Sequence, residues 1–127
     1  MKKLLTFLAL LSSLYSSSCV PLDELYSKEY KICASKALNE YDITRCITTE
    51  LKQADKELNT AYNDAQKRIQ KFRQKDLLNI QRLWIKYTDA KCGFLYHKES
   101  GSAGLSSSAE CKLQETILRT IELKKIN

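Results

Sequence analysis

Between residues 22 and 92 the chain contains no glycine and no proline, and this uninterrupted stretch constrains the fold more than any other feature. Glycine and proline are the residues that most often mark turns and helix ends, so their absence favours long helices. The stretch also lacks a sustained alternation of apolar and polar residues, which argues against half-buried strands. The sequence therefore predicts an all-α domain.

Residues 77–92 hold the only tryptophan of the chain, Trp84, and end in a cysteine. Apolar side chains recur in this stretch at intervals of three and four residues, at Leu77, Ile80, Trp84 and Tyr87. This spacing places the four side chains on one face of a helix. The pattern predicts that this face is buried and that Trp84 anchors the core.

The longest expected helix covers residues 44–72, with Thr44 as its N-cap. Its apolar side chains form one seam at helical spacing: Ile47, Leu51, Ala54, Leu58, Ala61, Ala65, Ile69 and Phe72. Because three members of the seam are alanine, close packing inside one domain is favoured over a dimeric zipper. A shorter helix is expected before it, from the spacing of Leu22, Tyr26, Tyr30, Cys33 and Ala37.

The polar residues 72–76 predict a tight turn, with Asp76 as the N-cap of the next helix, although a kinked continuous helix is the alternative. Residues 93–108 contain all three glycines and predict a long loop, which in a compact domain is often functional. Ser108 then caps a last helix, whose inner side carries Leu113, Ile117, Thr120 and Ile121. The expected architecture is a small disulfide-stapled helical bundle: a long antiparallel hairpin with short N-terminal and C-terminal helices.

The first residues have the layout of a secretory signal peptide: Lys2 and Lys3, an apolar run over 4–14, and small residues at 16–18. We therefore expect a signal peptide at 1–18, a lead-in at 19–32 and a helical domain at 33–124. Removing two lysines leaves 19 basic and 15 acidic residues, a net charge of about +4. For an exported protein this charge suits an anionic envelope or simply solubility, and nucleic acid is not the expected partner.

All five cysteines lie at or after the expected cleavage point. Cys19 falls where a bacterial lipoprotein carries its lipid, and membrane contact is expected only through that lipid. The position three residues upstream holds no leucine, so ordinary cleavage nearby is the alternative. The remaining four, in an oxidising compartment, predict two disulfides: Cys33, Cys46, Cys92 and Cys111.

The hairpin limits how these four cysteines pair. If it turns near residue 74, Cys92 faces residue 57, and Cys46 lies about 16 Å further along the helix at 1.5 Å per residue. A disulfide requires Cα atoms within about 7 Å, which excludes Cys46–Cys92. Of the two remaining schemes, Cys33–Cys46 with Cys92–Cys111 needs the least rearrangement.

The sequence offers no pattern typical of catalysis or metal binding. Four cysteines without a CxxC pair, together with a single histidine, argue against a zinc site. His97 stands alone among serines in the expected loop, where a solvated histidine is the simplest interpretation. We therefore expect no cofactor, no metal and no enzymatic activity.

Three blocks of residues resemble a known family. Asp55, Leu58, Asn59 and Tyr62 form a D-x-x-L-N-x-x-Y block after Cys46. Gln81 and Trp84, with Asp89 and Cys92, form a Q-x-x-W block, and the closing block contains Cys111, Thr116, Arg119 and Leu123. Together they resemble the lysozyme inhibitor LprI-like family of small exported bacterial proteins, although Thr88 stands where that family often has arginine.

The resemblance implies a four-cysteine helical domain in the bacterial envelope and, further, inhibition of lysozyme. For the block residues themselves we expect core roles, with Asn59 and Gln81 hydrogen-bonded across the helix interface and Tyr62 packed on Trp84.

Two functions follow as hypotheses. The first is a binding protein that blocks a lysozyme by steric occlusion, through loop residues suited to hot-spot contacts: Phe94, Tyr96, His97 and Lys98. Animal lysozymes are commonly basic, so a net charge of about +4 opposes association unless a local acidic patch offsets it. The alternative is a structural or accessory envelope protein, lipid-anchored or not, that binds another envelope component.

Overall fold

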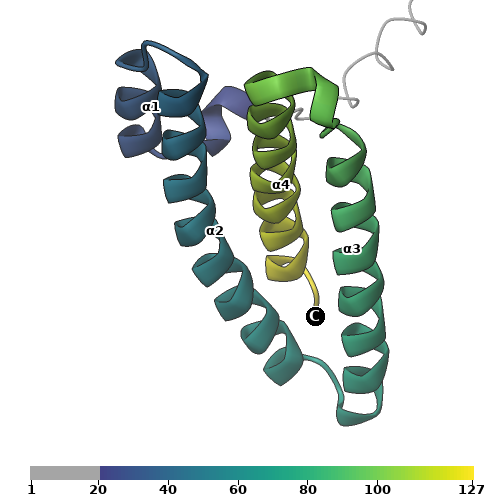
Figure 1. Cartoon of the computed structure of the whole chain (residues 1–127). Coiled ribbons are helices and arrows are strands. Elements are labelled where there is room, and N and C mark those ends of the chain that lie inside the picture. Colours follow the sequence, from purple (N-terminus) through teal and green to yellow (C-terminus); the bar gives the residue numbers. More distant parts are fainter. Residues whose placement is uncertain (1–20) are drawn as a thin grey trace, which may run out of the picture.

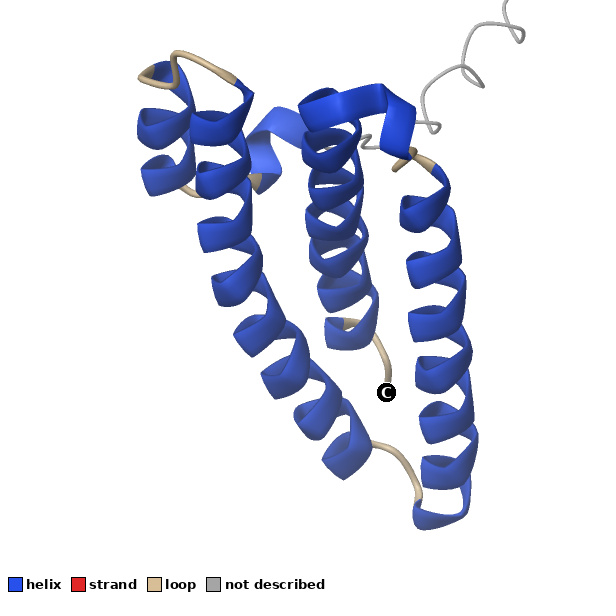
Figure 2. Ribbon diagram, in the orientation of Figure 1, coloured by secondary structure: helices blue, strands red, loops and turns tan. Residues whose placement is uncertain are grey.

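The computed structural model describes residues 21–127, and all the regular structure in this range is helical (Figures 1 and 2). The expected signal peptide at 1–18 and Cys19 lie outside the described residues. Three short connections join four α-helices: α1 (Lys28–Ser35), α2 (Glu40–Arg68), α3 (Gln74–Phe94) and α4 (Gly101–Lys124). Short 3-10 turns occupy Leu22–Leu25 (η1), Lys71–Arg73 (η2) and Lys98–Ser100 (η3). The predicted all-α class is confirmed.

The long helix α2 begins four residues earlier than Thr44. Its N-cap is Asn39, whose side chain accepts a hydrogen bond from the backbone N–H of Asp42 at 3.0 Å. Thr44 instead donates its hydroxyl to the carbonyl of Glu40 at 2.7 Å, inside the helix. Acidic residues in the first turn and basic ones in the last complement the helix dipole, which supports the earlier start.

The turn between α2 and α3 is closed by two glutamines rather than by an aspartate cap. The Gln66 side chain donates to the carbonyl of Gln74 at 3.1 Å, and the Gln74 side chain donates to the carbonyl of Gln66 at 2.8 Å. Asp76 lies in the first turn of α3, not at its N-cap. Phe72, which we expected on the seam, is exposed in η2 because α2 already ends at Arg68.

The glycine- and serine-rich region is mostly helical, so the predicted long loop over 93–108 and the short last helix from Ser108 are wrong. Gly101 adopts a φ of 60° and turns the chain directly into α4. Gly104 is buried, and a Cβ there would lie 2.8 Å from the Cβ of Ser100, so this glycine permits a close approach. Ser106 donates its hydroxyl to the carbonyl of Ala103 and to Glu40 of α2, which anchors the serine-rich turn.

The two legs of the hairpin diverge from the turn, and α4 lies between them (Figure 1). Helix α4 packs more extensively on α2 than on α3. Where α2 ends beside the C-terminus of α4, Arg68 donates to the carbonyl oxygens of Leu123 and Ile126 at 2.8 and 3.0 Å. These bonds satisfy carbonyl groups that the end of α4 leaves without helical partners.

Two apolar clusters form the core along α2 and α4. One lies toward the α2–α3 turn and contains Leu58, Ala61, Ala65, Ile69, Leu77 and Leu123, with Tyr62, Trp84 and Ile126 packed against it. The other lies toward α1 and contains Ile47, Ala54 and Leu113, with flanking side chains that include Tyr26, Tyr30 and Ile117. The alanines of the predicted seam allow α4 to approach α2 closely.

Both expected disulfides are present. Cys33–Cys46 joins α1 to the start of α2 with a Cα separation of 5.7 Å, and Cys92–Cys111 joins α3 to α4 with a separation of 5.5 Å. They close segments of 13 and 19 residues. In the chain-entropy model each stabilises the fold by about 3 kcal/mol, a large share for a domain of this size.

Candidate functional site

Helix α3 buries a face of mixed polarity and exposes an apolar one, contrary to the expectation for Ile80 and Tyr87. The buried positions are Leu77, Gln81, Thr88 and Cys92, with Trp84 half-buried beside them. Ile80 and Tyr87 instead lie on an exposed stripe with two further apolar side chains. The stripe comprises Ile80, Leu83, Tyr87 and Phe94, with exposed fractions of 51%, 66%, 59% and 87%.

Polar pairing with α4 explains this rotation of α3. Gln81 accepts a hydrogen bond from Arg119 Nε at 3.0 Å in the buried interface. Lys91 pairs with Glu115 at 2.6 Å, and Lys112 pairs with Asp89 at 3.3 Å. With the Cys92–Cys111 disulfide, these contacts hold the face of Gln81 and Thr88 inward and leave the apolar stripe facing outward.

The residues predicted to contact a partner gather at one end of the α3–α4 pair. Phe94 ends α3, and Tyr96, His97 and Lys98 follow in the short connection to α4. All four side chains are exposed, and His97 Nδ1 accepts a hydrogen bond from the backbone N–H of Glu99 at 3.3 Å. The Cys92–Cys111 disulfide lies at the base of this tip, so the aromatic side chains are held on a constrained turn rather than on a long loop.

Residues from all three sequence blocks meet around one cleft, which we call the Trp84 cleft. Its volume is about 400 Å³, within the range of small-ligand sites. It opens where α2 and α3 diverge over α4, and its lining is Leu51, Asp55, Leu58, Asn59, Trp84, Ile85, Thr88, Asp89, Lys112 and Thr116. Sequence spacing alone did not reveal it, because the cleft depends on how far the hairpin legs separate.

The block residues therefore do not all share the expected core role. Leu58 and Gln81 are buried, and Tyr62 and Trp84 pack against the cluster at the turn. Asp55 and Asn59 are exposed at the cleft, and Gln81 is bonded to Arg119 rather than to Asn59. Tyr62 uses its hydroxyl to accept a hydrogen bond from Gln66 at 2.7 Å.

The charges of the Trp84 cleft are only partly balanced. Asp89 has Lys112 as its ion-pair partner. Although Asp55 is exposed as a whole, partial burial in the cleft raises the pKa of its carboxyl, and the nearby charge of Lys112 lowers this pKa by less. Thr88 is only 5% exposed, and among residues 21–127 its hydroxyl oxygen has no hydrogen-bond partner.

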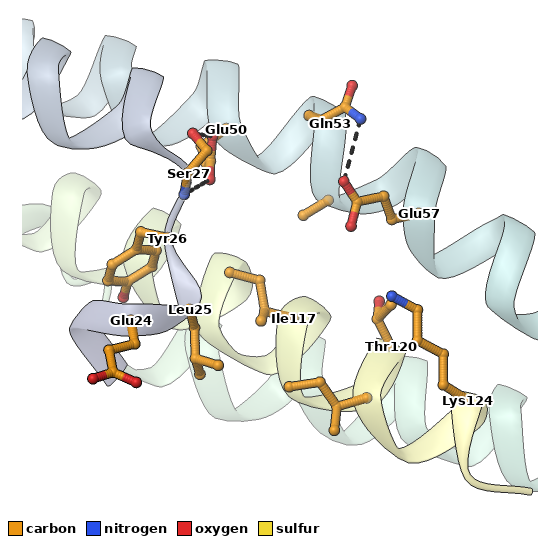
Figure 3. A pocket seen from close by; sticks show the side chains of 12 residues that line it. Glu24, Leu25, Tyr26, Ser27, Glu50, Gln53, Glu57, Ile117, Thr120 and Lys124 are labelled. Carbon is orange, nitrogen blue, oxygen red and sulfur yellow. Dashed lines mark hydrogen bonds between the residues drawn. The ribbon is translucent and has the colours of Figure 1, made fainter. Parts of the chain in front are cut away.

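A second cleft, the acidic cleft, lies on the other side of the α2–α4 seam (Figure 3). Its volume is about 370 Å³, and Tyr26 and Ser27 close one end of it. Three carboxylates line it, at Glu24, Glu50 and Glu57, with the single cation Lys124 on the wall formed by α4.

Two of these carboxylates already have partners. Glu50 accepts hydrogen bonds from the backbone N–H and the hydroxyl of Ser27 at 2.8 and 2.7 Å, which fixes the start of α1. Glu57 accepts from Gln53 at 3.3 Å. The carboxylates of the acidic cleft therefore serve chiefly to attach the N-terminal segment to α2.

Other kinds of site find little support in the described part of the chain. No group of three or more histidine, cysteine, aspartate or glutamate side chains is placed there to hold a metal ion. None of the helices in this part is long and apolar enough to cross a membrane.

The fold defines a small helical protein with two disulfides and an exposed apolar stripe on α3. Comparison with protein families matches residues 31–123 to the family described as Lysozyme inhibitor LprI. The chain therefore belongs to the LprI family. The searches of curated proteins and of solved structures gave no match.

Proposed function

We propose that this protein is exported and inhibits a lysozyme by binding it and covering its active site. Membership of the LprI family supports this proposal, since the family is described by that activity. The two disulfides support export, because such bonds persist mainly in oxidising compartments. In this proposal the protein acts by binding and carries out no catalysis of its own.

The observation that carries the proposal is the exposed apolar stripe of α3, together with the exposed Tyr96 in the connection that follows this helix. Four large apolar side chains on one helix face are more than scattered surface residues, and such patches mark interaction sites. Aromatic residues dominate the energetics of protein interfaces, and Tyr87, Phe94 and Tyr96 provide three of them on one side of the molecule. Because a disulfide anchors this helix end to α4, little ordering entropy would be lost on binding.

The charge of the protein does not oppose this function everywhere on its surface. A net charge of about +4 repels a basic partner at long range. The Trp84 cleft, however, places the carboxylates of Asp55 and Asp89 at the protein surface. Local negative charge of this kind can orient a basic enzyme as it approaches.

A muramidase assay with the oxidised protein and a basic animal lysozyme tests the proposal. We expect micromolar protein to inhibit the enzyme. Leu83→Ser and Tyr87→Ser should each weaken inhibition about tenfold or more, as for a hot-spot residue.

Leu38→Ser is the matched control, because Leu38 is equally apolar and even more exposed but lies between α1 and α2. Its inhibition should equal that of the unaltered protein. Absence of inhibition by the unaltered, oxidised protein would overturn the proposal. Equal loss in all three variants would show that α3 is not the contact surface.

A further inference from the structure

The Trp84 cleft combines features that suit one kind of ligand group. The indole of Trp84 and the side chains of Ile85 and Leu51 provide an apolar wall, and Asp55 contributes a carboxylate. In the described residues Asp55 has no ion-pair partner within 4.0 Å, because Lys112 is bonded to Asp89 instead. A flat apolar wall beside a carboxylate that lacks an ion pair is the arrangement that a desolvated cation requires.

The wall of the cleft contains a buried hydroxyl oxygen that has no partner in the described part of the chain. Thr88 lines the cleft, is 5% exposed and leaves its hydroxyl oxygen without a hydrogen-bond partner within residues 21–127. A buried hydroxyl of this kind is costly unless it is satisfied. A guanidinium carries five N–H donors in a planar fork, so it can bond the Asp55 carboxylate and still direct a donor at the exposed side chain of Asn59, which also lines the cleft.

We propose that the Trp84 cleft receives an arginine side chain of the protein partner, with its guanidinium on the carboxylate of Asp55 and its alkyl stem along Trp84. The inference rests on the proposed function for the identity of the partner, a basic lysozyme, but not for the chemistry of the cleft. The volume of about 400 Å³ accommodates one long side chain and leaves room for solvent. Partial burial raises the pKa of the Asp55 carboxyl, and a bound cation stabilises its charged form.

The acidic cleft is the poorer candidate although it has more carboxylates. Glu50 is already engaged twice by Ser27, and Glu57 is engaged by Gln53. Lys124 on the opposite wall would compete with any incoming cation (Figure 3). This difference supplies the control for the test, because Glu57 and Asp55 are exposed acids on the same helix, two residues apart.

The first experiment uses Nα-acetyl-L-arginine amide as the probe and the fluorescence of Trp84, the only tryptophan, as the readout. One charged group gives millimolar affinity at best, so the titration extends to about 50 mM at constant ionic strength. We expect saturable binding to the unaltered protein and to Glu57→Gln. Asp55→Asn should bind at least about tenfold more weakly.

The matched ligand is Nα-acetyl-L-citrulline amide, which has nearly the same shape but no charge. It should produce no saturable change. Equal responses to the arginine and citrulline probes, absence of saturation, or unchanged binding to Asp55→Asn would each overturn the inference.

The second experiment repeats the lysozyme assay with Asp55→Asn and Glu57→Gln, which remove the same charge. We expect Asp55→Asn alone to weaken inhibition, by at least about tenfold. Equal inhibition by the two variants would overturn the inference and leave the proposed function standing. If the unaltered protein bound the arginine probe through Asp55 but did not inhibit lysozyme, the proposed function would fail while the assignment of the cleft held.

Discussion

Helix α4 has two interfaces of opposite character. Toward α2 it packs Leu113 and Leu123, both fully buried, against the alanine-rich seam. Toward α3 it presents Arg119, which donates to Gln81, and the two helices are further joined by ion pairs and a disulfide, with Leu77 and Trp84 in the same apolar cluster as Leu123. The α2 side is held almost entirely by apolar burial, whereas the α3 side adds polar pairing and a covalent bond to a smaller apolar contact.

This difference explains where the contact surface can lie. A helix that is attached by its apolar face has only a polar face to offer the solvent. Helix α3 is attached by a face of mixed polarity, so some of its apolar side chains, those of the exposed stripe, remain available for a partner. The attachment depends on the Arg119–Gln81 hydrogen bond and on the disulfide, while Thr88 Oγ1 and Arg119 Nη2 are buried without a partner among residues 21–127 and lower its stability.

The largest expected loss of stability comes from removing a side chain of the apolar α2–α4 interface. Leu113→Ala should destabilise the fold by about 2–5 kcal/mol, because it removes a fully buried side chain and leaves a cavity. Leu118→Ala on the same helix is the control, since Leu118 is exposed, and should cost less than about 1 kcal/mol. Urea unfolding with intact disulfides measures both. Similar losses for the two variants would contradict an apolar seam at Leu113.

Removing the covalent link of the polar interface should have the next largest effect. Replacing Cys92 and Cys111 together by alanine should cost about 3 kcal/mol. Hydrogen exchange should accelerate in α3 more than in α2, because α2 keeps its apolar contact with α4. The matched variant replaces Cys33 and Cys46, and there the faster exchange should appear in α1. Uniform acceleration over all helices in both variants would show that the two interfaces do not differ.

The buried polar pair is expected to have a smaller and non-additive effect. Gln81→Leu should cost about 1–3 kcal/mol, since it leaves Arg119 Nε buried without an acceptor. The double variant Gln81→Leu, Arg119→Met should recover much of that loss, because both buried polar groups are then removed. A double-mutant cycle from urea unfolding measures the coupling. Additive losses would mean that the bond contributes nothing to the interface.

The same contrast explains what the sequence could predict. The seam of α2 and both disulfides followed from spacing and reach, because apolar periodicity and chain geometry are local properties. The orientation of α3 did not follow, since Ile80 and Tyr87 have an apolar spacing that normally indicates burial. Their exposure depends on pairs such as Gln81 with Arg119, which are 38 residues apart in the chain.

The glycine-rich region shows a second limit of local pattern. Three glycines and a run of serines normally indicate a loop, whereas here Gly104 is a helical residue that allows a close approach to Ser100. Packing against α2 therefore outweighs the low helix propensity of these residues. The Trp84 cleft was hidden for a related reason: its block residues carried the family resemblance, but their meeting around a cleft depends on the position of α4.

The smallest predicted effect concerns Asp55, which lies where the apolar seam gives way to the Trp84 cleft. Burial raises the pKa of Asp55 above its ordinary value of 3.8, so the folded protein binds this proton more tightly than the unfolded chain does. The resulting stability is complete below the unfolded pKa and is lost as the pH rises through the folded pKa. Asp55→Asn should therefore gain stability relative to the unaltered protein between pH 3 and pH 7.

Urea unfolding of both proteins at the two pH values measures this difference, and an NMR titration of the Asp55 carboxyl carbon measures the pKa itself. Binding of an arginine side chain acts in the opposite direction, because a cation favours the carboxylate. Saturating Nα-acetyl-L-arginine amide should thus lower the titration midpoint of Asp55, whereas the citrulline analogue should leave it in place. A midpoint below 3.8 in the free protein would show that a cation of the protein itself already pairs with the Asp55 carboxylate. The cleft would then have no unpaired carboxylate for a partner's arginine.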